Sequence, residues 1–282
     1  MEEIARIRSF DGWQLRFRHR SEVLSCDMHF SLYLPPQAEQ ERVPVLTWLS
    51  GLTCTDENFV QKAGAQRAAA QYGVALLAPD TSPRGDDVPD DASGSWDFGL
   101  GAGFYVNATQ APWDRHYRMY DYVVEELPAL VFAAQDALDA DAQAIFGHSM
   151  GGHGALTIAL RSARYRSVSA FAPICSPMNC PWGEKALAAY LGDDRERWRA
   201  YDSCELLRGT DARLPMLVDQ GSADGFLEEQ LKTHLLREAC RERDLPATIR
   251  MQEGYDHSYF FIATFIEEHI AFHAGHCRGQ AD

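Results

Sequence analysis

Short, uninterrupted apolar runs alternate with helix-like segments, and this alternation most limits how the 282-residue chain can fold. Each run ends in turn residues, which is typical of strands buried on both faces of a parallel sheet. Parallel strands need long crossover connections, and helices usually provide them. The runs cover 43–49, 74–78, 142–146, 168–172, 214–218 and 247–251, and the helix-like segments cover 59–72, 117–134, 152–160, 227–243 and 259–273. The pattern predicts the α/β class, with a mostly parallel central sheet and helices on both faces.

Two segments before the first run follow a different pattern. Residues 13–19 and 28–34 alternate apolar and polar side chains, and Pro35 ends the second segment. Alternation implies one buried and one wetter face, so we predict N-terminal antiparallel strands at an edge of the sheet. Pro128 falls inside a helix-like segment and predicts a kink or a break there. No repeat or linker-like boundary is present, so we expect a single domain over residues 1–282.

The acidic composition limits the partners. A formal net charge of −15 argues against a nucleic acid or an anionic membrane, because both need a basic face. The seven cysteines form no C-x-x-C pair, so they predict neither a disulfide framework nor a zinc site. The acidic start Met1-Glu2-Glu3 and the lack of a long apolar run predict no signal peptide and no membrane span. We therefore expect a cytosolic protein without a metal.

The strongest local motif is G-x-S-x-G at residues 147–151, with Ser149 at its centre. It lies between a buried run and a helix-like segment, which is the setting of the nucleophile elbow in the α/β-hydrolase fold. A tight, strained strand-to-helix turn presents the hydroxyl and leaves no room for side chains at Gly147 and Gly151. The free N–H groups at the start of the helix favour an oxyanion. We predict an α/β-hydrolase fold with Ser149 as nucleophile.

A serine nucleophile needs a general base, and this fold supplies it late in the chain. His257 lies between the last predicted strand and the last predicted helix, where the fold places that base. His148 and His153 flank the elbow, and we expect their side chains to point elsewhere. Three further histidines have helical spacing, and we expect them on a solvated terminal helix rather than at a metal site: His269, His273 and His276.

Three aspartates compete to be the acid that orients the base. Asp256 adjoins His257 in sequence, which is a poor geometry for reaching its ring. Asp219 is still at the end of a predicted strand, whereas Asp224 lies in the loop that follows. That loop is the customary position of the acid, so we predict Asp224, which would hold the imidazole tautomer and stabilise the imidazolium.

The oxyanion hole of this fold uses two backbone N–H groups. One belongs to the residue after the nucleophile, here Met150. The other comes from the loop after an earlier strand, and the order of residues in the segment 49–54 favours Leu52.

Beyond these motifs, distinctive segments are spread over nearly the whole chain. They include L-S-G-L-T-C-T (49–55), A-P-D-T-S-P-R-G (78–85), S-W-D-F-G (95–99), F-G-H-S-M-G-G-H-G-A-L (146–156), C-P-W-G (180–183) and E-G-Y-D-H-S-Y (253–259). Through these segments the sequence resembles the S-formylglutathione hydrolase family, also called esterase D. The resemblance implies hydrolysis of the thioester S-formylglutathione to formate and glutathione, a step of formaldehyde detoxification. It also implies side activity on small esters, no cofactor, a cytosolic enzyme and a homodimer, with the family's nucleophile, acid and base at Ser149, Asp224 and His257.

Substrate contacts are harder to predict. Lys62 and Arg84 are candidates to hold the charged ends of glutathione. A thiol at Cys54 would make the enzyme sensitive to alkylation through bulk alone. Four residues in loops at the expected sheet edge are candidates for the wall of the acyl pocket, with ordinary loop packing as the alternative: Cys54, Trp96, Phe98 and Trp182.

Two other functions use the same fold. A broad carboxylesterase or an acyltransferase would share the triad and differ in the pocket and the acceptor, which a sequence indicates poorly. A non-catalytic scaffold used for binding usually lacks a triad residue, whereas all three are present here.

Overall fold

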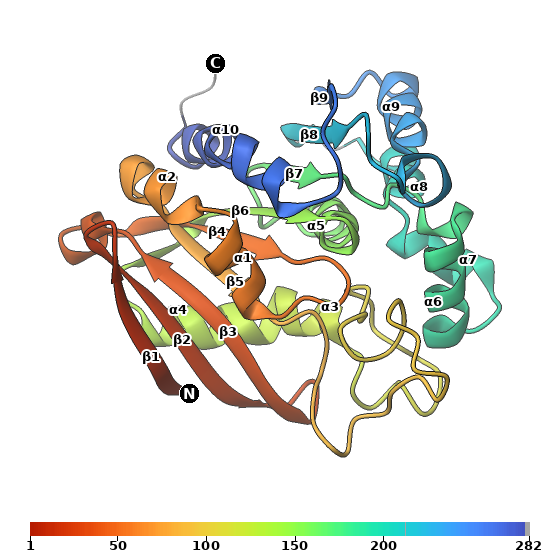
Figure 1. The fold of residues 1–282 in the computed structure, drawn as a ribbon, viewed down its shortest axis with the longest axis horizontal. Coiled ribbons are helices and arrows are strands. Elements are labelled where there is room, and N and C mark those ends of the chain that lie inside the picture. Colours follow the sequence, from red (N-terminus) through yellow and green to blue (C-terminus); the bar gives the residue numbers. More distant parts are fainter. Residues whose placement is uncertain (212, 280–282) are drawn as a thin grey trace.

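One mixed sheet runs through the computed structural model, which describes residues 1–211 and 213–279. Its nine described strands lie in the order β1-β2-β3-β5-β4-β6-β7-β8-β9 (Figure 1). The pairs from β1 to β3, and β3 with β5, are antiparallel, and all others are parallel. The strands are β1 (Glu2–Ser9), β2 (Gly12–Ser21), β3 (Cys26–Leu34), β4 (Val43–Leu49), β5 (Ala75–Pro79), β6 (Leu138–His148), β7 (Val168–Phe171), β8 (Met216–Gly221) and β9 (Ala247–Gln252). The mostly parallel sheet with N-terminal antiparallel strands is confirmed.

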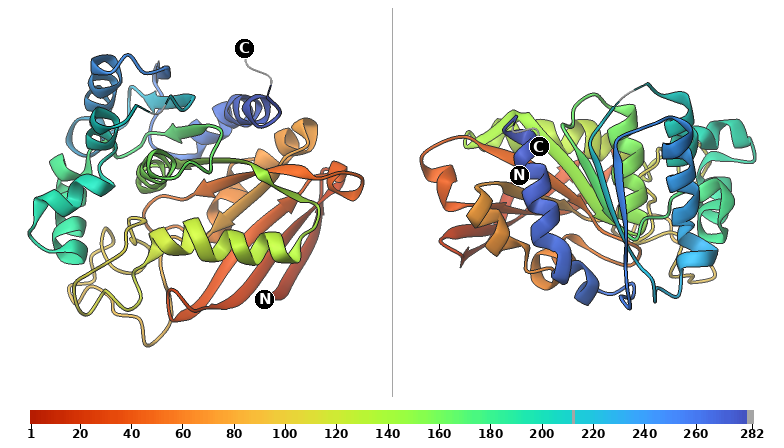
Figure 2. Two further views of the ribbon diagram at one scale, coloured as in Figure 1. Left: turned by 180° about the vertical axis from the view of Figure 1, so that it is seen from behind. Right: turned by 90° about the horizontal axis from the view of Figure 1, so that it is seen from above.

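Helices cover both faces of the sheet (Figures 1 and 2). On one face lie α1 (Asp56–Lys62), α2 (Ala65–Tyr72) and α10 (Tyr259–Cys277). The other face carries α4 (Leu127–Ala134) and α5 (Met150–Arg161), and beyond α5 pack α8 (Ser203–Gly209) and α9 (Thr233–Glu242). None of the described helices is long and apolar enough to cross a membrane.

Two predicted helices are interrupted, each for a local reason. The segment 59–72 is divided into α1 and α2 by Gly64, whose φ of 67° is left-handed. The segment 117–134 begins as the short α3 (Met119–Asp121) and continues as a wider π turn (Tyr122–Glu126) before α4. Pro128 is the second residue of α4 and comes directly after this π turn, and Glu126 and Leu127 before it keep right-handed helical backbone angles. The sequence predicted a kink or a break at this proline. The structure shows a change of helix type just before it, and the chain is not broken at Pro128 itself.

Other features differ from the sequence prediction. The outermost strand β1 was not predicted, because its side chains are mostly exposed and give no apolar alternation. The helices between β7 and β8 were also not predicted; they include α6 (Pro181–Leu191) and α7 (Arg195–Trp198). The expectation of a solvated terminal helix is wrong in part, because His269 and His273 on α10 are fully buried.

The long loop between β5 and α3 is anchored by aromatic packing. Phe98 lies 4.9 Å from Tyr190 of α6, measured between ring centroids, and Tyr117 stacks on the same ring at 5.1 Å. The Tyr190 hydroxyl also donates to the carbonyl of Ala102 (2.9 Å). These contacts hold the loop against α6, at the sheet edge where the parallel strands end.

Candidate active site

Ser149 occupies a strained turn between β6 and α5. Its φ of 57° and ψ of −118° lie where side chains are rarely found, and such strain is typical of functional positions. The backbone around it is firmly held: its N–H donates to the carbonyl of Phe171 (3.0 Å), and its carbonyl accepts from the N–H of Ile174 (3.2 Å). The side chain therefore has a fixed origin at the carboxyl end of the sheet.

The two glycines of the motif allow close contact with the end of β4. A Cβ atom at Gly147 would lie 2.6 Å from the carbonyl oxygen of Leu49, and one at Gly151 would lie 2.6 Å from that of Ser50. Real Cβ atoms do not come so close to backbone. The steric reason for G-x-S-x-G given from the sequence is therefore confirmed.

Asp224 and His257 form a short hydrogen bond. Nδ1 of His257 lies 2.6 Å from Oδ2 of Asp224, whose side chain is fully buried while that of the histidine is 19% exposed. The carboxyl group also accepts from the backbone N–H of Phe226 (2.9 Å) and from Nε2 of Gln220 (3.2 Å). Because a carboxylate only accepts, Nδ1 carries the proton and Nε2 is left to take another.

The competing aspartates are engaged elsewhere. Asp256 accepts from the hydroxyl of the nearby Ser258 (2.6 Å). Asp219 forms a bidentate ion pair with Arg250 (2.7 and 2.5 Å). Asp224 is thus the aspartate that contacts His257.

Ser149 and His257 line one cavity of about 270 Å³. No hydrogen bond joins the serine hydroxyl to the imidazole among the described residues, and such bonds often tighten only when substrate is bound. Of the other predicted residues, five also line this cavity: Leu52, Cys54, Lys62, Trp96 and Trp182. Four do not: Asp224, Met150, Arg84 and Phe98. The remaining lining residues are Gly51, Thr53, Asn58, His148, Phe226, Ser258 and Tyr259.

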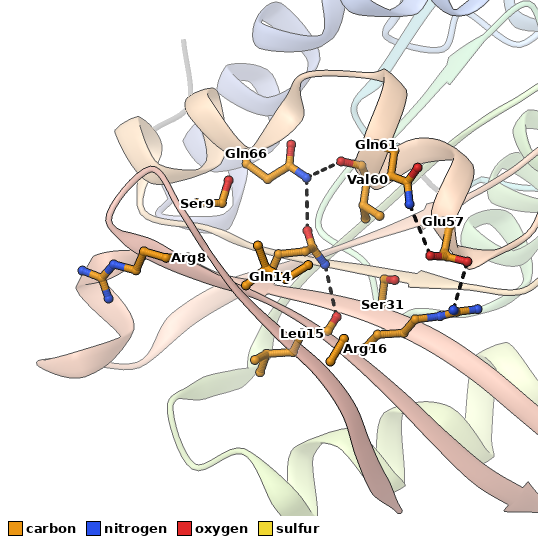
Figure 3. A pocket seen from close by; sticks show the side chains of 12 residues that line it. Arg8, Ser9, Gln14, Leu15, Arg16, Ser31, Glu57, Val60, Gln61 and Gln66 are labelled. Carbon is orange, nitrogen blue, oxygen red and sulfur yellow. Dashed lines mark hydrogen bonds and ion pairs between the residues drawn. The ribbon is translucent and has the colours of Figure 1, made fainter.

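A second cavity of similar size, about 260 Å³, lies between the N-terminal strands and α1 (Figure 3). Its polar groups bond to one another: Gln66 donates to Gln14 (3.1 Å), and Arg16 pairs with Glu57 (2.9 Å). It contains none of the residues predicted for the site. The two cavities differ in chemistry rather than in volume.

The loop after β4 is held in place from outside the cavity. The N–H of Thr53, a residue with φ of 67°, donates to the carbonyl of Gly101 (2.9 Å). The carbonyl of Cys54 accepts from the hydroxyl of Thr81 (2.5 Å) and from Nη2 of Arg84 (3.0 Å). Leu52, directly before these anchored residues, donates its N–H to no acceptor in the described part of the chain. Its amide is therefore free for an oxyanion.

Arg84 and Phe98 have other contacts than those expected. Nε of Arg84 lies 2.9 Å from Oδ2 of the buried Asp80, so its charge is already paired. Burial raises the pKa of Asp80, although the Arg84 guanidinium opposes this shift. Phe98 packs with Trp113 and Tyr190 inside the long loop, which is the loop-packing alternative considered above.

A chain of aromatic rings leads from the surface to the base. Trp96, which is 54% exposed, meets Trp182 edge-on at 5.4 Å between centroids. Trp182 lies 4.8 Å from Phe226, which in turn lies 5.1 Å from the His257 ring. Phe226 was not predicted from the sequence. Its place two residues after Asp224 is the signal that could have indicated it.

His148 also lies in the site, contrary to the expectation that it points elsewhere. Its ring centroid is 4.4 Å from that of His257. Burial, and secondarily the charge of His257, lower the pKa of His148 well below its usual range, so this imidazole stays neutral. His153 does point away, with Nε2 3.0 Å from the carbonyl of Phe104.

Cys54 and Lys62 add a thiol and a cation to the cavity. Burial raises the pKa of the Cys54 thiol, which is therefore no ready nucleophile at neutral pH. The exposed Lys62 has its Nζ 5.7 Å from the centroid of the Tyr259 ring, and it is the only lysine or arginine among the described lining residues. In the described ranges, no group of His, Cys, Asp and Glu side chains is arranged to hold a metal ion.

The fold and this site together define a hydrolase of the α/β-hydrolase class. The family described as "Putative esterase" matches residues 21–272. The S-formylglutathione hydrolase of Arabidopsis thaliana is 54% identical over 277 residues, which cover 97% of each chain. The chain belongs to the S-formylglutathione hydrolase family of esterases, and it is an enzyme.

Solved structures agree with this assignment. An S-formylglutathione hydrolase from Agrobacterium tumefaciens is 49% identical and superposes with a TM-score of 0.95, covering 98% of this chain and 100% of that one. A fluorophosphonate-binding serine hydrolase of Staphylococcus aureus reaches a TM-score of 0.75 at 17% identity, over 93% of this chain and 98% of its own. The latter likeness concerns the fold alone.

Proposed function

We propose that this enzyme hydrolyses S-formylglutathione with Ser149 as nucleophile, His257 as general base and Asp224 as the acid that orients it. The observation that carries the proposal is the 2.6 Å bond between His257 and Asp224 beside a strained serine in the same cavity. A hydroxyl alone is a weak nucleophile, and this arrangement provides the base that activates it.

The reaction has two halves. In the first, His257 takes the Ser149 proton while the serine oxygen attacks the formyl carbon, and the carbon–sulfur bond then breaks. The glutathione sulfur leaves with the proton that His257 returns to it. In the second half, His257 takes a proton from a water that attacks the formyl carbon. The bond from that carbon to the Ser149 oxygen then breaks, His257 returns the proton to the serine oxygen, and formate leaves. Each half forms a cationic imidazolium, which the Asp224 carboxylate stabilises.

The negative charge on the formyl oxygen needs donors in both halves. We assign them to the backbone N–H groups of Leu52 and Met150, the latter being the first residue of α5. The first N–H groups of a helix have no acceptor within it, and the helix dipole favours an anion there. Each donor is expected to supply about 3–4 kcal/mol of transition-state stabilisation.

The cavity suits a small acyl group attached to a charged carrier. A formyl group has almost no steric requirement, so a wall formed by Cys54, Trp96 and Trp182 leaves sufficient room. Glutathione carries two carboxylates, and the chain's net charge of −15 repels them. Lys62 opposes this repulsion locally, and we assign it to a carboxylate of the substrate.

The proposal includes a single-domain, cytosolic enzyme that forms a homodimer, as the family resemblance implies. Sedimentation velocity on the purified chain gives the mass in solution and so checks the dimer. A broad esterase with the same triad is the second candidate, favoured by the exposed Trp96 and Phe226, whose rings could receive a larger apolar ester group.

The deciding experiment measures hydrolysis of S-formylglutathione and p-nitrophenyl acetate by wild type and Ser149→Ala. We expect fast thioester turnover that the variant lacks. Turnover of the acetate alone would keep the triad and reject the thioester as substrate. A variant as active as wild type would reject Ser149 as nucleophile. Ser162→Ala, at the half-buried residue that follows the last turn of α5, is the matched control and should keep full activity.

A further inference from the structure

A second Ser-His-Asp array lies buried directly beneath the active site. Nε2 of His269 is 3.1 Å from Oδ2 of Asp219, and Nδ1 of the same ring is 2.8 Å from the hydroxyl of Ser169. All three residues have no exposed surface. They come from β8, α10 and β7, so the array joins two strands to a helix.

The array continues through a second histidine. Nε2 of His273 lies 2.8 Å from the Ser169 hydroxyl, and Nδ1 lies 2.7 Å from that of Ser167. Both histidines have lowered pKa values, because burial disfavours their charged form, although Asp219 opposes the shift at His269. Both rings are therefore neutral.

Neutral rings fix the direction of every bond. Burial would raise the pKa of Asp219, but hydrogen bonds from His269 and Arg250 outweigh it and hold the value at about 2. An ionised carboxylate only accepts, so Nε2 of His269 donates to it and Nδ1 accepts from the hydroxyl of Ser169. The Ser169 oxygen must then accept from His273, whose Nδ1 accepts from Ser167. Each donor meets one acceptor, and the network has one consistent arrangement.

This array contacts all three segments that carry the catalytic residues. The His269 ring stacks on Phe171 at 3.8 Å, and the carbonyl of Phe171 accepts the N–H of Ser149. Asp219 lies in β8, which leads into the loop of Asp224, and its own carbonyl accepts the N–H of Ala172 (2.7 Å). His269 belongs to α10, which begins two residues after His257.

We propose that Asp219, His269 and Ser169 are positioning residues, which set the relative placement of the nucleophile, acid and base segments from below. The inference rests on the proposed catalytic roles of Ser149, Asp224 and His257. No chemical step is assigned to the array, because it is sealed from the cavity. Its effect on the reaction is geometric: misplacement of reacting groups by 1 Å can cost about 100-fold in rate.

The two serines provide a matched test. Ser169→Ala and Ser167→Ala delete the same hydroxyl from buried residues at neighbouring positions, and each removes one hydrogen bond to His273. Only Ser169 also contacts His269. The assay is p-nitrophenyl acetate hydrolysis, with rates expressed per active site titrated by a fluorophosphonate, so that unfolded protein is not counted.

We expect Ser169→Ala to lower kcat about 10-fold with KM changed less than two-fold, and Ser167→Ala to keep the wild-type kcat. Ser169→Cys, which retains a weak donor, should recover part of the loss and also serves if the alanine variant does not fold. Equal kcat in wild type and both serine variants would overturn the proposal, even if both melt at a lower temperature. Equal losses in both would overturn it as well. Failure of the catalytic proposal is distinguishable, because Ser149→Ala would then remain active.

Discussion

The proposed catalytic array at the cavity and the fully buried array contain the same three residue types, Ser, His and Asp, but differ in their surroundings. In the catalytic array, Nδ1 of the imidazole meets the carboxylate, whereas in the buried array Nε2 does. Ser149 has a strained backbone at the wall of a cavity, whereas Ser169 lies within the regular strand β7. Asp219 is further neutralised by Arg250, and Asp224 pairs with no lysine or arginine among the described residues.

The difference teaches that the residue types alone do not make a catalytic site. Reaction needs access for the substrate, a nucleophile presented by the elbow, donors for the oxyanion and a carboxylate whose charge is free to stabilise an imidazolium. The buried array has none of these, but it has fully paired donors and acceptors in a dry interior, which make a network rigid. The buried array therefore contributes rigidity to the segments that carry the site.

The largest difference is expected when the two histidines receive the same substitution. His257→Gln removes the base and should lower kcat by at least about 10⁴-fold. His269→Gln keeps a donor for Asp219 and should lower kcat by less than about 100-fold. Steady-state kinetics with p-nitrophenyl acetate, per titrated site, measure both. Comparable losses in the two variants would erase the distinction between catalytic and positioning histidines.

Substitutions of the two aspartates should differ in the quantity that they change, which is kcat for one and stability for the other, as well as in the size of the loss of kcat. Asp224→Asn leaves the imidazole without its carboxylate and is expected to lower kcat by about 10³–10⁴-fold with little change in stability. Asp219→Asn leaves Arg250 paired with Glu268 alone and should cost about 2 kcal/mol of unfolding free energy, the equivalent of the lowered pKa of Asp219. Urea unfolding and kcat, measured on the same preparations, test the pair. A larger loss of kcat in Asp219→Asn than in Asp224→Asn would reverse the roles.

Much of the fold and part of the site could be predicted from the sequence, for identifiable reasons. Buried parallel strands appear as uninterrupted apolar runs, and the elbow needs glycines that no other residue can replace, so β6, Ser149 and α5 were indicated together. The strand β1 was not, because its exposed side chains carry no such pattern. The missing N–H of Pro128 indicated an irregular helix in this region, but the sequence did not show that it would be a π turn just before the proline.

The remaining features depend on contacts between distant segments. A histidine on a helix gives no sign in sequence of whether it faces solvent or two buried serines, which is why His269 and His273 were expected to be solvated. Arg84 was a candidate to bind the substrate because the sequence does not show whether a cation in a loop pairs with a ligand or with a carboxylate of the chain itself. Only the fold brings it to Asp80 and the carbonyl of Cys54.

The buried array should also make stability depend on pH. The pKa of His269 is lowered by burial, so the unfolded chain binds its proton at a higher pH than the folded chain does. Stability from this residue is therefore fully present above about pH 6.5 and is lost as the pH falls below that value. Asp219, with its pKa of about 2, contributes a similar loss only below about pH 4.

Urea unfolding at pH 7 and pH 5.5 tests this sign. His269→Gln should be less stable than wild type by about 1–2 kcal/mol at pH 7, because buried hydrogen bonds are lost. Since glutamine does not titrate, the gap should narrow at pH 5.5. A gap that widens on acidification would mean that His269 is charged in the folded protein, and the assigned bond directions would be wrong.

The smallest expected effect concerns how the open cavity binds the charge of the substrate, since substrate cannot reach the buried array. Lys62 is the cation of the open cavity, so Lys62→Gln should raise KM for S-formylglutathione about five-fold, a loss of about 1 kcal/mol as for an exposed ion pair. KM for p-nitrophenyl acetate should not change, because that substrate has no carboxylate.

The matched control is Lys185→Gln, whose lysine is paired with Asp97 (2.6 Å) and does not line the cavity. The Lys62 effect should also shrink as salt is added, since salt screens exposed charges. An equal rise in KM for both substrates would instead make Lys62 a part of the cavity wall without a role in charge recognition.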